Sequence, residues 1–165
     1  MRFHRNLVTP VRPLDFDEDL DFSSYDFGKH YPLLGLTGVH ASGEFFLEKD
    51  ATLYCSITLK GTMLLSDAYT LEKFPQAFDF EDEFALLRSP EEEGEGYIFS
   101  ENTIELSDVA FCAICSRVPL SPKKKGSKLN SSGEGYSVYL DGQTPPEPTS
   151  SPFDALKDFD VGESD

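Results

Sequence analysis

The sequence predicts an α+β fold: a mainly antiparallel β-sheet, curled toward an open barrel, with one principal helix and short accessory helices. Apolar and polar residues alternate over residues 53–59, a period that gives a strand one buried and one exposed face. Over residues 104–114 the apolar residues recur at helical spacing, and Ser107 and Asp108 supply an N-cap and a first-turn acid. We therefore expect a helix over residues 107–116 that packs on the sheet.

Three closely spaced strands form the centre of the predicted sheet. They lie at residues 44–48, 53–65 and 74–84, and such short connections favour an antiparallel meander. Gly61 interrupts the middle strand, which predicts a bulge or a bend at which the sheet curls. The residues expected to be buried together on this sheet are Leu53, Cys55, Ile57, Leu59, Phe78 and Phe80.

Further elements are predicted on both sides of this meander. Residues 14–25 alternate apolar side chains with a row of aspartates, which predicts a strand with an acidic outer face. Residues 25–38 contain several glycines and Pro32 and predict a loop. Short apolar runs at residues 97–99 and 136–140 predict additional strands.

The 165 residues predict one domain followed by a tail. We expect the domain to span residues 1–141, and residues 142–165 to form a Pro/Ser linker and an acidic tail with a short docking helix around Leu156. No run approaches the roughly 20 apolar residues of a membrane span, and the N-terminus lacks the apolar core of a secretory signal. The sequence therefore predicts a cytoplasmic protein with no membrane partner.

The charge of the chain indicates the kind of partner. Thirty acidic and 14 basic residues give a formal net charge of −16, which repels phosphate backbones and attracts basic proteins. The alternative is that this charge only maintains solubility. If the acidic segments converge after folding, they form a protein-binding face, whose candidate residues are Asp15, Asp17, Asp19, Asp21, Glu91, Glu92 and Glu93.

A lysine-rich segment at residues 122–130 is the one basic cluster outside the N-terminus. Such a cluster can hold phosphate groups and makes a candidate nucleic-acid site, although most clusters of this kind are exposed loops. Its candidate residues are Lys123, Lys124, Lys125 and Lys128.

Catalytic, metal and cofactor sites are not predicted. Cys112 and Cys115 form a CxxC pair that would share one helix face, so a metal site and a redox pair are both conceivable. The pair lies in an apolar stretch without a second ligand pair, which favours a packing role. The aspartate row lacks the pattern of a calcium loop, and no nucleophile elbow, phosphate-binding loop or dinucleotide fingerprint occurs. We expect a protein that is not an enzyme.

Three stretches together resemble a known family. Residues 56–84 carry its strand–turn–strand pattern, residues 103–120 carry its helix that ends in proline, and residues 125–139 with the short tail at 152–159 complete the order. The matching positions are Gly61, Thr62, Thr70, Leu71, Ile104, Leu106, Asp108, Val109 and Pro119. In these features the chain resembles the YceD family, the large ribosomal RNA subunit accumulation proteins, and looks most like its branch from low-GC Gram-positive bacteria.

The resemblance implies a role in accumulation of the large-subunit (23S) ribosomal RNA, and hence in ribosome biogenesis. Asp67 stands where the family commonly has a cysteine and Tyr69 where it has an arginine, so the metal and nucleic-acid binding suspected for those cysteines does not carry over. Two hypotheses follow. The protein binds a basic ribosomal protein or an assembling large-subunit particle, or it contacts ribosomal RNA directly through the lysines and the basic N-terminus. A third hypothesis is that the protein is a soluble domain of unknown role.

Overall fold

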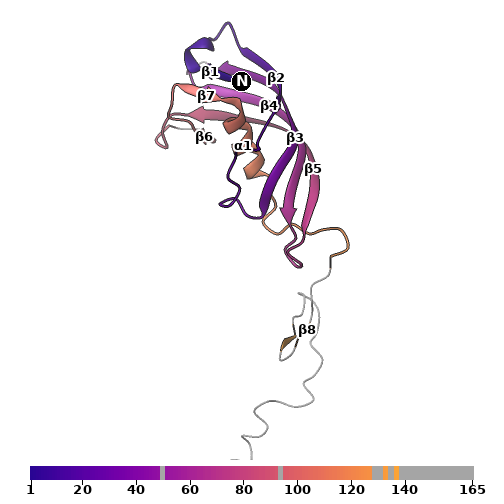
Figure 1. Cartoon of the computed structure of the whole chain (residues 1–165). Coiled ribbons are helices and arrows are strands. Elements are labelled where there is room, and N and C mark those ends of the chain that lie inside the picture. Colours follow the sequence, from indigo (N-terminus) through magenta and orange to yellow (C-terminus); the bar gives the residue numbers. More distant parts are fainter. Residues whose placement is uncertain (49–50, 93–94, 128–131, 134–135, 138–165) are drawn as a thin grey trace, which may run out of the picture. The chain divides into compact units, whose positions relative to one another are not determined.

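The computed structural model describes residues 1–48, 51–92, 95–127, 132–133 and 136–137 (Figure 1). Contacts divide the chain into two units, Met1–Lys128 and Leu129–Asp165. In the described part of the second unit, β8 (Ser132–Gly133) pairs with β9 (Tyr136–Ser137) in antiparallel fashion. The predicted domain boundary at residue 141, the linker and the docking helix of the tail lie outside the described residues.

A five-stranded sheet makes up most of the first unit. Its strands lie in the order β2-β3-β4-β5-β6 and do not close into a barrel. Neighbours are antiparallel from β2 to β5, whereas β6 runs parallel to β5. The strands are β2 (Leu14–Leu20), β3 (Leu33–Leu47), β4 (Leu53–Ser66), β5 (Lys73–Leu87) and β6 (Gly96–Ile98).

A second, two-stranded sheet brings the N-terminus next to the helix. β1 (Arg2–His4) pairs antiparallel with β7 (Thr103–Glu105), and the helix α1 (Leu106–Ser116) follows β7 directly. A short 3-10 turn, η1 (Arg5–Leu7), comes after β1. The helix lies against the sheet at β4, which is the packing that the sequence predicts (Figure 1). The α+β class is therefore confirmed.

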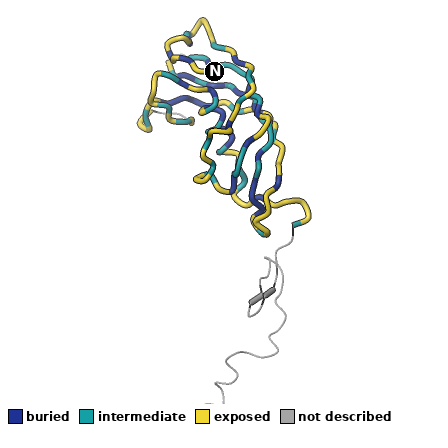
Figure 2. The backbone as a smooth tube through the Cα atoms, viewed as in Figure 1, coloured by how far each residue is buried: buried dark blue, intermediate teal, exposed yellow. Residues whose placement is uncertain are grey.

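The core lies between the inner face of the sheet and α1. Leu53, Cys55, Ile57 and Leu59 are buried, as the alternation along β4 predicts, and Figure 2 shows buried segments along the strands of the sheet. Phe78 and Phe80 are only partly buried but pack against this core. On the helix side, the ring of Phe111 lies in contact with the rings of Phe22, Tyr25, Phe27 and His30.

Three sequence-based boundaries are wrong. The strand predicted over residues 14–25 ends at Leu20, because the Asp21 side chain accepts a hydrogen bond from the Ser23 amide and turns the chain there. Residues 33–38 belong to β3 rather than to a loop, because the burial of Leu33 and Leu36 outweighs the glycines between and after them. The helix begins at Leu106 instead of Ser107, and its N-cap, Glu105, makes no side-chain capping bond. Strand β7 runs directly into the helix, and the Leu106 amide donates to the carbonyl oxygen of Met1, which takes over part of the capping role.

Glycines allow close approach at two points of the sheet. A Cβ atom on Gly43 would lie 2.0 Å from the Ser56 carbonyl oxygen, so only glycine lets β3 and β4 pair there. A Cβ atom on Gly61 would lie 2.9 Å from the Phe78 ring. Strand β4 continues through Gly61, and the irregularity lies opposite it in β3, between Thr37 and His40.

A buried arginine fastens the N-terminus to the rest of the unit. Arg5 is only 7% exposed, and its guanidinium donates hydrogen bonds to the carbonyl oxygens of Leu86 (2.9 Å), Phe99 (2.7 Å) and Glu101 (3.3 Å). Burial, and then the nearby Arg88, lower the pKa of Arg5. Arg5 belongs to the basic N-terminus through which the second hypothesis has the protein contact RNA, and its position inside the fold shows that this residue serves structure instead.

Truncation of the core should destabilise the fold. Ile57 is 1% exposed on the central strand, so Ile57→Ala removes buried apolar contacts and leaves a cavity. We expect a loss of about 2–5 kcal/mol in the free energy of unfolding, measured by urea denaturation. Thr58→Ala, on the opposite face of β4, serves as the control; equal losses for both variants would contradict the assigned faces.

Replacement of Arg5 should also destabilise the protein. Arg5→Lys keeps the charge but cannot donate to three carbonyl groups in the same planar geometry. We expect a loss of about 2–4 kcal/mol, because buried carbonyl groups are left without donors. Arg12→Lys, at an exposed position, should change stability by less than about 0.5 kcal/mol. If the Arg5→Lys variant had the melting temperature of the parent protein, the three hydrogen bonds of Arg5 would contribute little to stability.

Candidate functional site

The strongest candidate site is the outer face of the sheet, which turns away from the core. Residues directly opposite each other on paired strands share a face, so the register defines it. Three rows of paired residues cross from β2 to β5. They are Asp15–Glu44–Ser56–Glu83, Asp17–Ser42–Thr58–Glu81 and Asp19–His40–Lys60–Asp79. We call this surface the outer sheet face.

Carboxylates lie along both sides of the outer sheet face. The two outer strands contribute six of them, and Glu44 on β3 adds a seventh, against a single lysine, Lys60. The middle of the face is formed by the small polar side chains of Ser42, Ser56 and Thr58. Neighbouring strands are about 4.8 Å apart, so the two outer rows of acids lie about 14 Å from each other.

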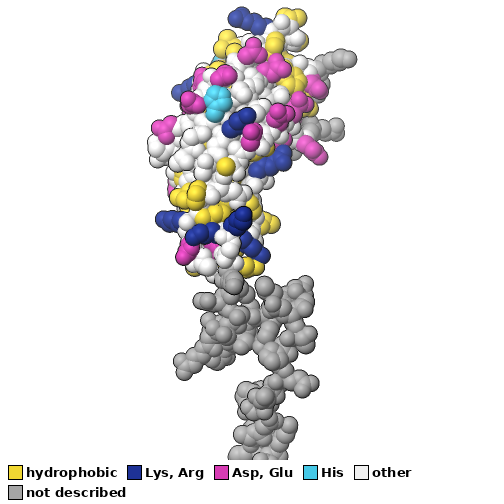
Figure 3. Space-filling model, turned by 90° about the vertical axis from the view of Figure 1, so that its right-hand side faces the viewer, with side chains coloured by type: hydrophobic (Ala, Val, Ile, Leu, Met, Phe, Trp, Pro, Cys, Tyr) yellow, Lys and Arg dark blue, Asp and Glu magenta, His cyan; other side chains and the backbone are white. Residues whose placement is uncertain are grey.

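Two groups on this face lie next to acids. Lys60 Nζ lies 3.3 Å from Asp79 Oδ2 and offsets one negative charge, and the ring nitrogens of His40 lie 3.4 Å from Asp17 and 2.9 Å from Asp19. No ion-pair partner within the described part of the chain is present for the other four carboxylates, which belong to Asp15, Glu44, Glu81 and Glu83. Figure 3 shows acidic side chains spread over the upper part of one side of the molecule.

The structure separates the acidic residues that the sequence grouped together. Asp15, Asp17 and Asp19 lie on the outer sheet face, whereas Asp21 follows the end of β2 and accepts hydrogen bonds from Ser23. Glu91 and Glu92 lie in the turn after β5, where Glu92 accepts a hydrogen bond from the Arg88 amide. Glu93 lies outside the described residues.

The sequence reading missed four acids of the outer sheet face: Glu44, Asp79, Glu81 and Glu83. The alternation of Asp79, Glu81 and Glu83 with phenylalanines was visible along β5. It could not be joined to the aspartates of β2, because the strand order and the register were unknown.

The lysine segment folds against the turn between β4 and β5. The Lys124 amide donates a 2.6 Å hydrogen bond to Asp67, and Lys124 Nζ lies 2.9 Å from Glu72 Oε2. Lys123 Nζ lies 4.5 Å from the centre of the Tyr69 ring. These two lysines and Lys125 are exposed, as an exposed loop predicts, whereas Lys128 lies outside the described residues. Figure 3 shows lysine and arginine side chains gathered at the lower end of the coloured part of the chain.

Asp67 joins the turn and the lysine segment. Its side chain is fully buried and accepts from the amides of Tyr69 and Thr70 (both 2.8 Å) as well as from Lys124. Burial alone would raise the pKa of Asp67, but these hydrogen bonds outweigh it and hold the pKa well below its usual range. The Asp67 carboxylate is therefore a structural group.

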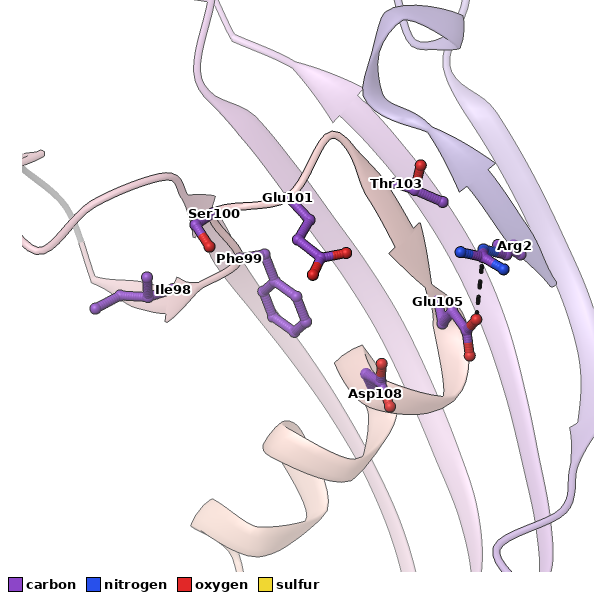
Figure 4. A pocket seen from close by; sticks show the side chains of 8 residues that line it. All are labelled: Arg2, Ile98, Phe99, Ser100, Glu101, Thr103, Glu105 and Asp108. Atoms are coloured by element: carbon purple, nitrogen blue, oxygen red, sulfur yellow. Dashed lines mark ion pairs between the residues drawn. The ribbon is translucent and has the colours of Figure 1, made fainter. Parts of the chain in front are cut away.

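A polar hollow of about 280 Å³ lies between β6, β7 and the start of α1 (Figure 4). Arg2, Glu101, Glu105 and Asp108 supply its charged groups, and Arg2 Nε lies 3.4 Å from Glu105 Oε1. Asp108 also accepts a hydrogen bond from the Tyr25 hydroxyl, and burial together with this bond raises the pKa of Tyr25 to about 12. The hollow is too acidic for an anion.

The CxxC pair is partly buried on α1. Burial raises the pKa of Cys112 and raises that of Cys115 to about 11, so both thiols stay protonated at neutral pH. Cys115 Sγ lies 3.8 Å from His30 Nδ1. Within the described residues, no group of three or more histidine, cysteine or acidic side chains is placed to hold a metal ion.

None of the helices in the described ranges is long and apolar enough to cross a membrane. Comparison of the chain with models of known families, with curated proteins and with solved structures finds no match.

Neutralising Asp67 should weaken the protein at neutral pH and change its response to acid. A carboxyl group whose folded pKa is depressed stabilises the fold above its unfolded pKa, about 4, and loses that contribution as pH falls below it. We expect Asp67→Asn to have a lower melting temperature than the parent protein at pH 7. The difference between the two melting temperatures should become smaller as the pH falls from 4 to 2.

Glu72→Gln provides the control for this measurement. It removes the exposed ion pair with Lys124 while keeping the Asp67 network, so its melting temperature should stay close to that of the parent. A constant difference between Asp67→Asn and the parent from pH 7 to pH 2 would contradict the role of the ionised carboxylate.

Proposed function

We propose that the protein is a non-enzymatic ribosome-biogenesis factor of the YceD type. In this proposal it acts in the cytoplasm and supports accumulation of the large-subunit ribosomal RNA by binding a basic ribosomal protein or an assembling large-subunit particle. The resemblance in residues 56–84 and 103–120 supports the ribosomal context. The excess of carboxylates on the outer sheet face supports a positively charged partner.

The observation that carries the proposal is the arrangement of carboxylates from β2, β3 and β5 on one face of the sheet. A rigid sheet holds them in fixed rows, so a basic partner meets a preformed potential rather than a mobile acidic segment. The spacing of about 14 Å between the outer rows is wide enough for a helix of about 10 Å diameter or for an extended chain. The Ser/Thr floor between them supplies hydroxyl groups for hydrogen bonds with the partner.

A non-enzymatic role is favoured by the state of the reactive groups. The described thiols are protonated at neutral pH, and the buried carboxylate Asp67 is committed to backbone amides. Neither group is available as a base or a nucleophile.

Direct contact with ribosomal RNA is the second candidate. The observation in its favour is that Asp67 fixes the lysine segment, so that the exposed Lys123, Lys124 and Lys125 are displayed at one end of the unit. Glu72 opposes it by neutralising Lys124. Binding of purified protein to naked ribosomal RNA, weakened by replacement of these lysines with serine, would favour this candidate.

Neutralising the outer sheet face should slow association with basic large-subunit proteins. We expect Glu81→Gln/Glu83→Gln to reduce the association rate for purified large-subunit proteins several-fold at low salt and to flatten its salt dependence. The matched control, Glu91→Gln/Glu95→Gln, removes the same charge outside this face and should have a smaller effect. In cells, deletion of the protein should lower large-subunit RNA relative to small-subunit RNA.

Two results would remove the proposal. One is a deletion strain with a normal ratio of the two subunit RNAs and no ribosomal component recovered with the tagged protein. The other is an equal effect of the two double substitutions, which would reduce the outer sheet face to a source of general charge.

A further inference from the structure

Among the described residues, strand β3 has an unpaired edge over its first six residues, 33–38. β3 spans 15 residues, but β2 pairs only with residues 39–45 of it. The opposite edge of β3 is occupied by β4 from Leu33 to Leu47. Along Leu33–Gly38, no strand of the described residues pairs with the side of β3 that continues the line of β2. We call this stretch the open edge.

The segment that passes beside the open edge does not pair with it. After β2 ends at Leu20, the backbone hydrogen bonds of residues 21–32 are local, from Tyr25 to Phe22, from His30 to Phe27 and from Leu33 to His30, apart from one that Pro32 accepts from Ser66 of β4. Within the described residues, no backbone bond joins this segment to residues 34–38. The outward amide and carbonyl groups of the open edge are therefore available to a further strand.

A hollow of about 530 Å³ lies along the open edge. Its walls are mostly apolar and come from both sides of the edge, with the side chains of Leu20, Phe22, Phe27, Leu34, Leu36 and Leu64. The one charged residue in the lining is Asp21. Hydrogen bonds from the amide and the hydroxyl of Ser23 lower the pKa of Asp21, so it is ionised at neutral pH.

Two glycines keep this space open. A Cβ atom on Gly35 would meet only Leu64, at 3.8 Å, and one on Gly38 would meet nothing within 4 Å. Larger side chains at Gly35 would therefore enter the hollow instead of clashing with the fold. The backbone of the open edge is exposed to an approaching chain at these two residues.

We propose that the open edge binds an extended segment of a basic partner protein as an added strand. Backbone hydrogen bonds to β3 hold the segment, an apolar side chain enters the hollow, and a lysine or arginine beside it meets Asp21. Strand addition of this kind takes affinity from the backbone and selectivity from pockets for alternate side chains. The added strand would occupy the half of the sheet edge that β2 leaves uncovered.

Charge distinguishes this occupant from a second copy of the chain. Pairing of two open edges would bring two Asp21 carboxylates and two chains of net charge −16 together. The strand irregularities between Leu33 and Gly35 and between Thr37 and His40 also limit the stretch that could pair with itself. A short, cationic and extended partner segment avoids both obstacles.

The inference rests on the proposed function, because it specifies the conformation in which the basic partner is held. It adds a site that is separate from the outer sheet face. The two can therefore be tested by different measurements.

The test uses the full chain and a synthetic peptide of alternating valine and threonine with lysines at both ends. We expect the peptide to slow hydrogen exchange of the amides in residues 34–38 at least tenfold, observed by NMR. Exchange along β6, the strand at the other edge of the sheet, should stay unchanged. A peptide in which proline replaces every threonine cannot form a strand ladder and should not protect these amides.

Two variants separate the parts of the site. Gly35→Ile should weaken peptide binding at least tenfold by filling the hollow, and its unchanged melting temperature would show that the fold is intact. Asp21→Asn keeps an oxygen for the Ser23 amide. It should weaken the lysine peptide several-fold but leave a glutamine-flanked peptide unaffected.

Each contrary result overturns the inference. These results are absence of peptide binding at millimolar concentration, binding without protection of residues 34–38, and binding undiminished by Gly35→Ile. Slow exchange of the same amides in the free protein would mean that the edge is already occupied, and would overturn it as well. If the peptide protects the edge but large-subunit proteins do not bind, the proposed function fails and the open edge stands. If large-subunit proteins bind but the peptide does not protect residues 34–38, the proposed function stands and only the inference about the open edge fails.

Discussion

The register of β4 between β3 and β5 is the constraint on which the rest of the structure depends. Ile57 lies opposite Gly43 on one side and Asp82 on the other, and this pairing turns every second residue of β4 into the core. A slip of one residue would exchange the two faces and bury the hydroxyl and charged side chains. Gly43 fixes the pairing, because any other residue would collide with the Ser56 carbonyl group. The outer sheet face exists only in this register.

The buried charged groups of this protein and the acids on its outer sheet face have different roles. Arg5 and Asp67 are buried, fully engaged with backbone groups, and hold distant segments together. Most acids of the outer sheet face are exposed, and four of them have no ion-pair partner within the described residues. Their mutual repulsion opposes folding, and the extensive strand pairing beneath them offsets it. A surface kept under such repulsion is suited to attract a basic molecule.

Sequence patterns predicted the elements better than their arrangement. The alternation along residues 53–59 and the helical spacing of residues 104–114 are local properties, and both elements formed as predicted. The start of β3 was missed because Gly35 and Gly38 mark a loop by propensity, while the burial of Leu33 and Leu36 is a tertiary effect. The full acidic face required the strand order, which no local pattern contains. Arg5 was misassigned because burial of a single arginine has no periodic signal.

The pairing of β1 with β7 has a consequence for the order of events during protein synthesis. Phe3 lies opposite Ile104, and Arg5 donates to carbonyl groups at residues 86, 99 and 101. Strand β1 and Arg5 are thus among the last parts of this unit to find their place during synthesis, because their partners leave the ribosome about a hundred residues after them. Until then β2 to β5 can form their hairpins successively, and the N-terminal strand closes the unit when the helix arrives.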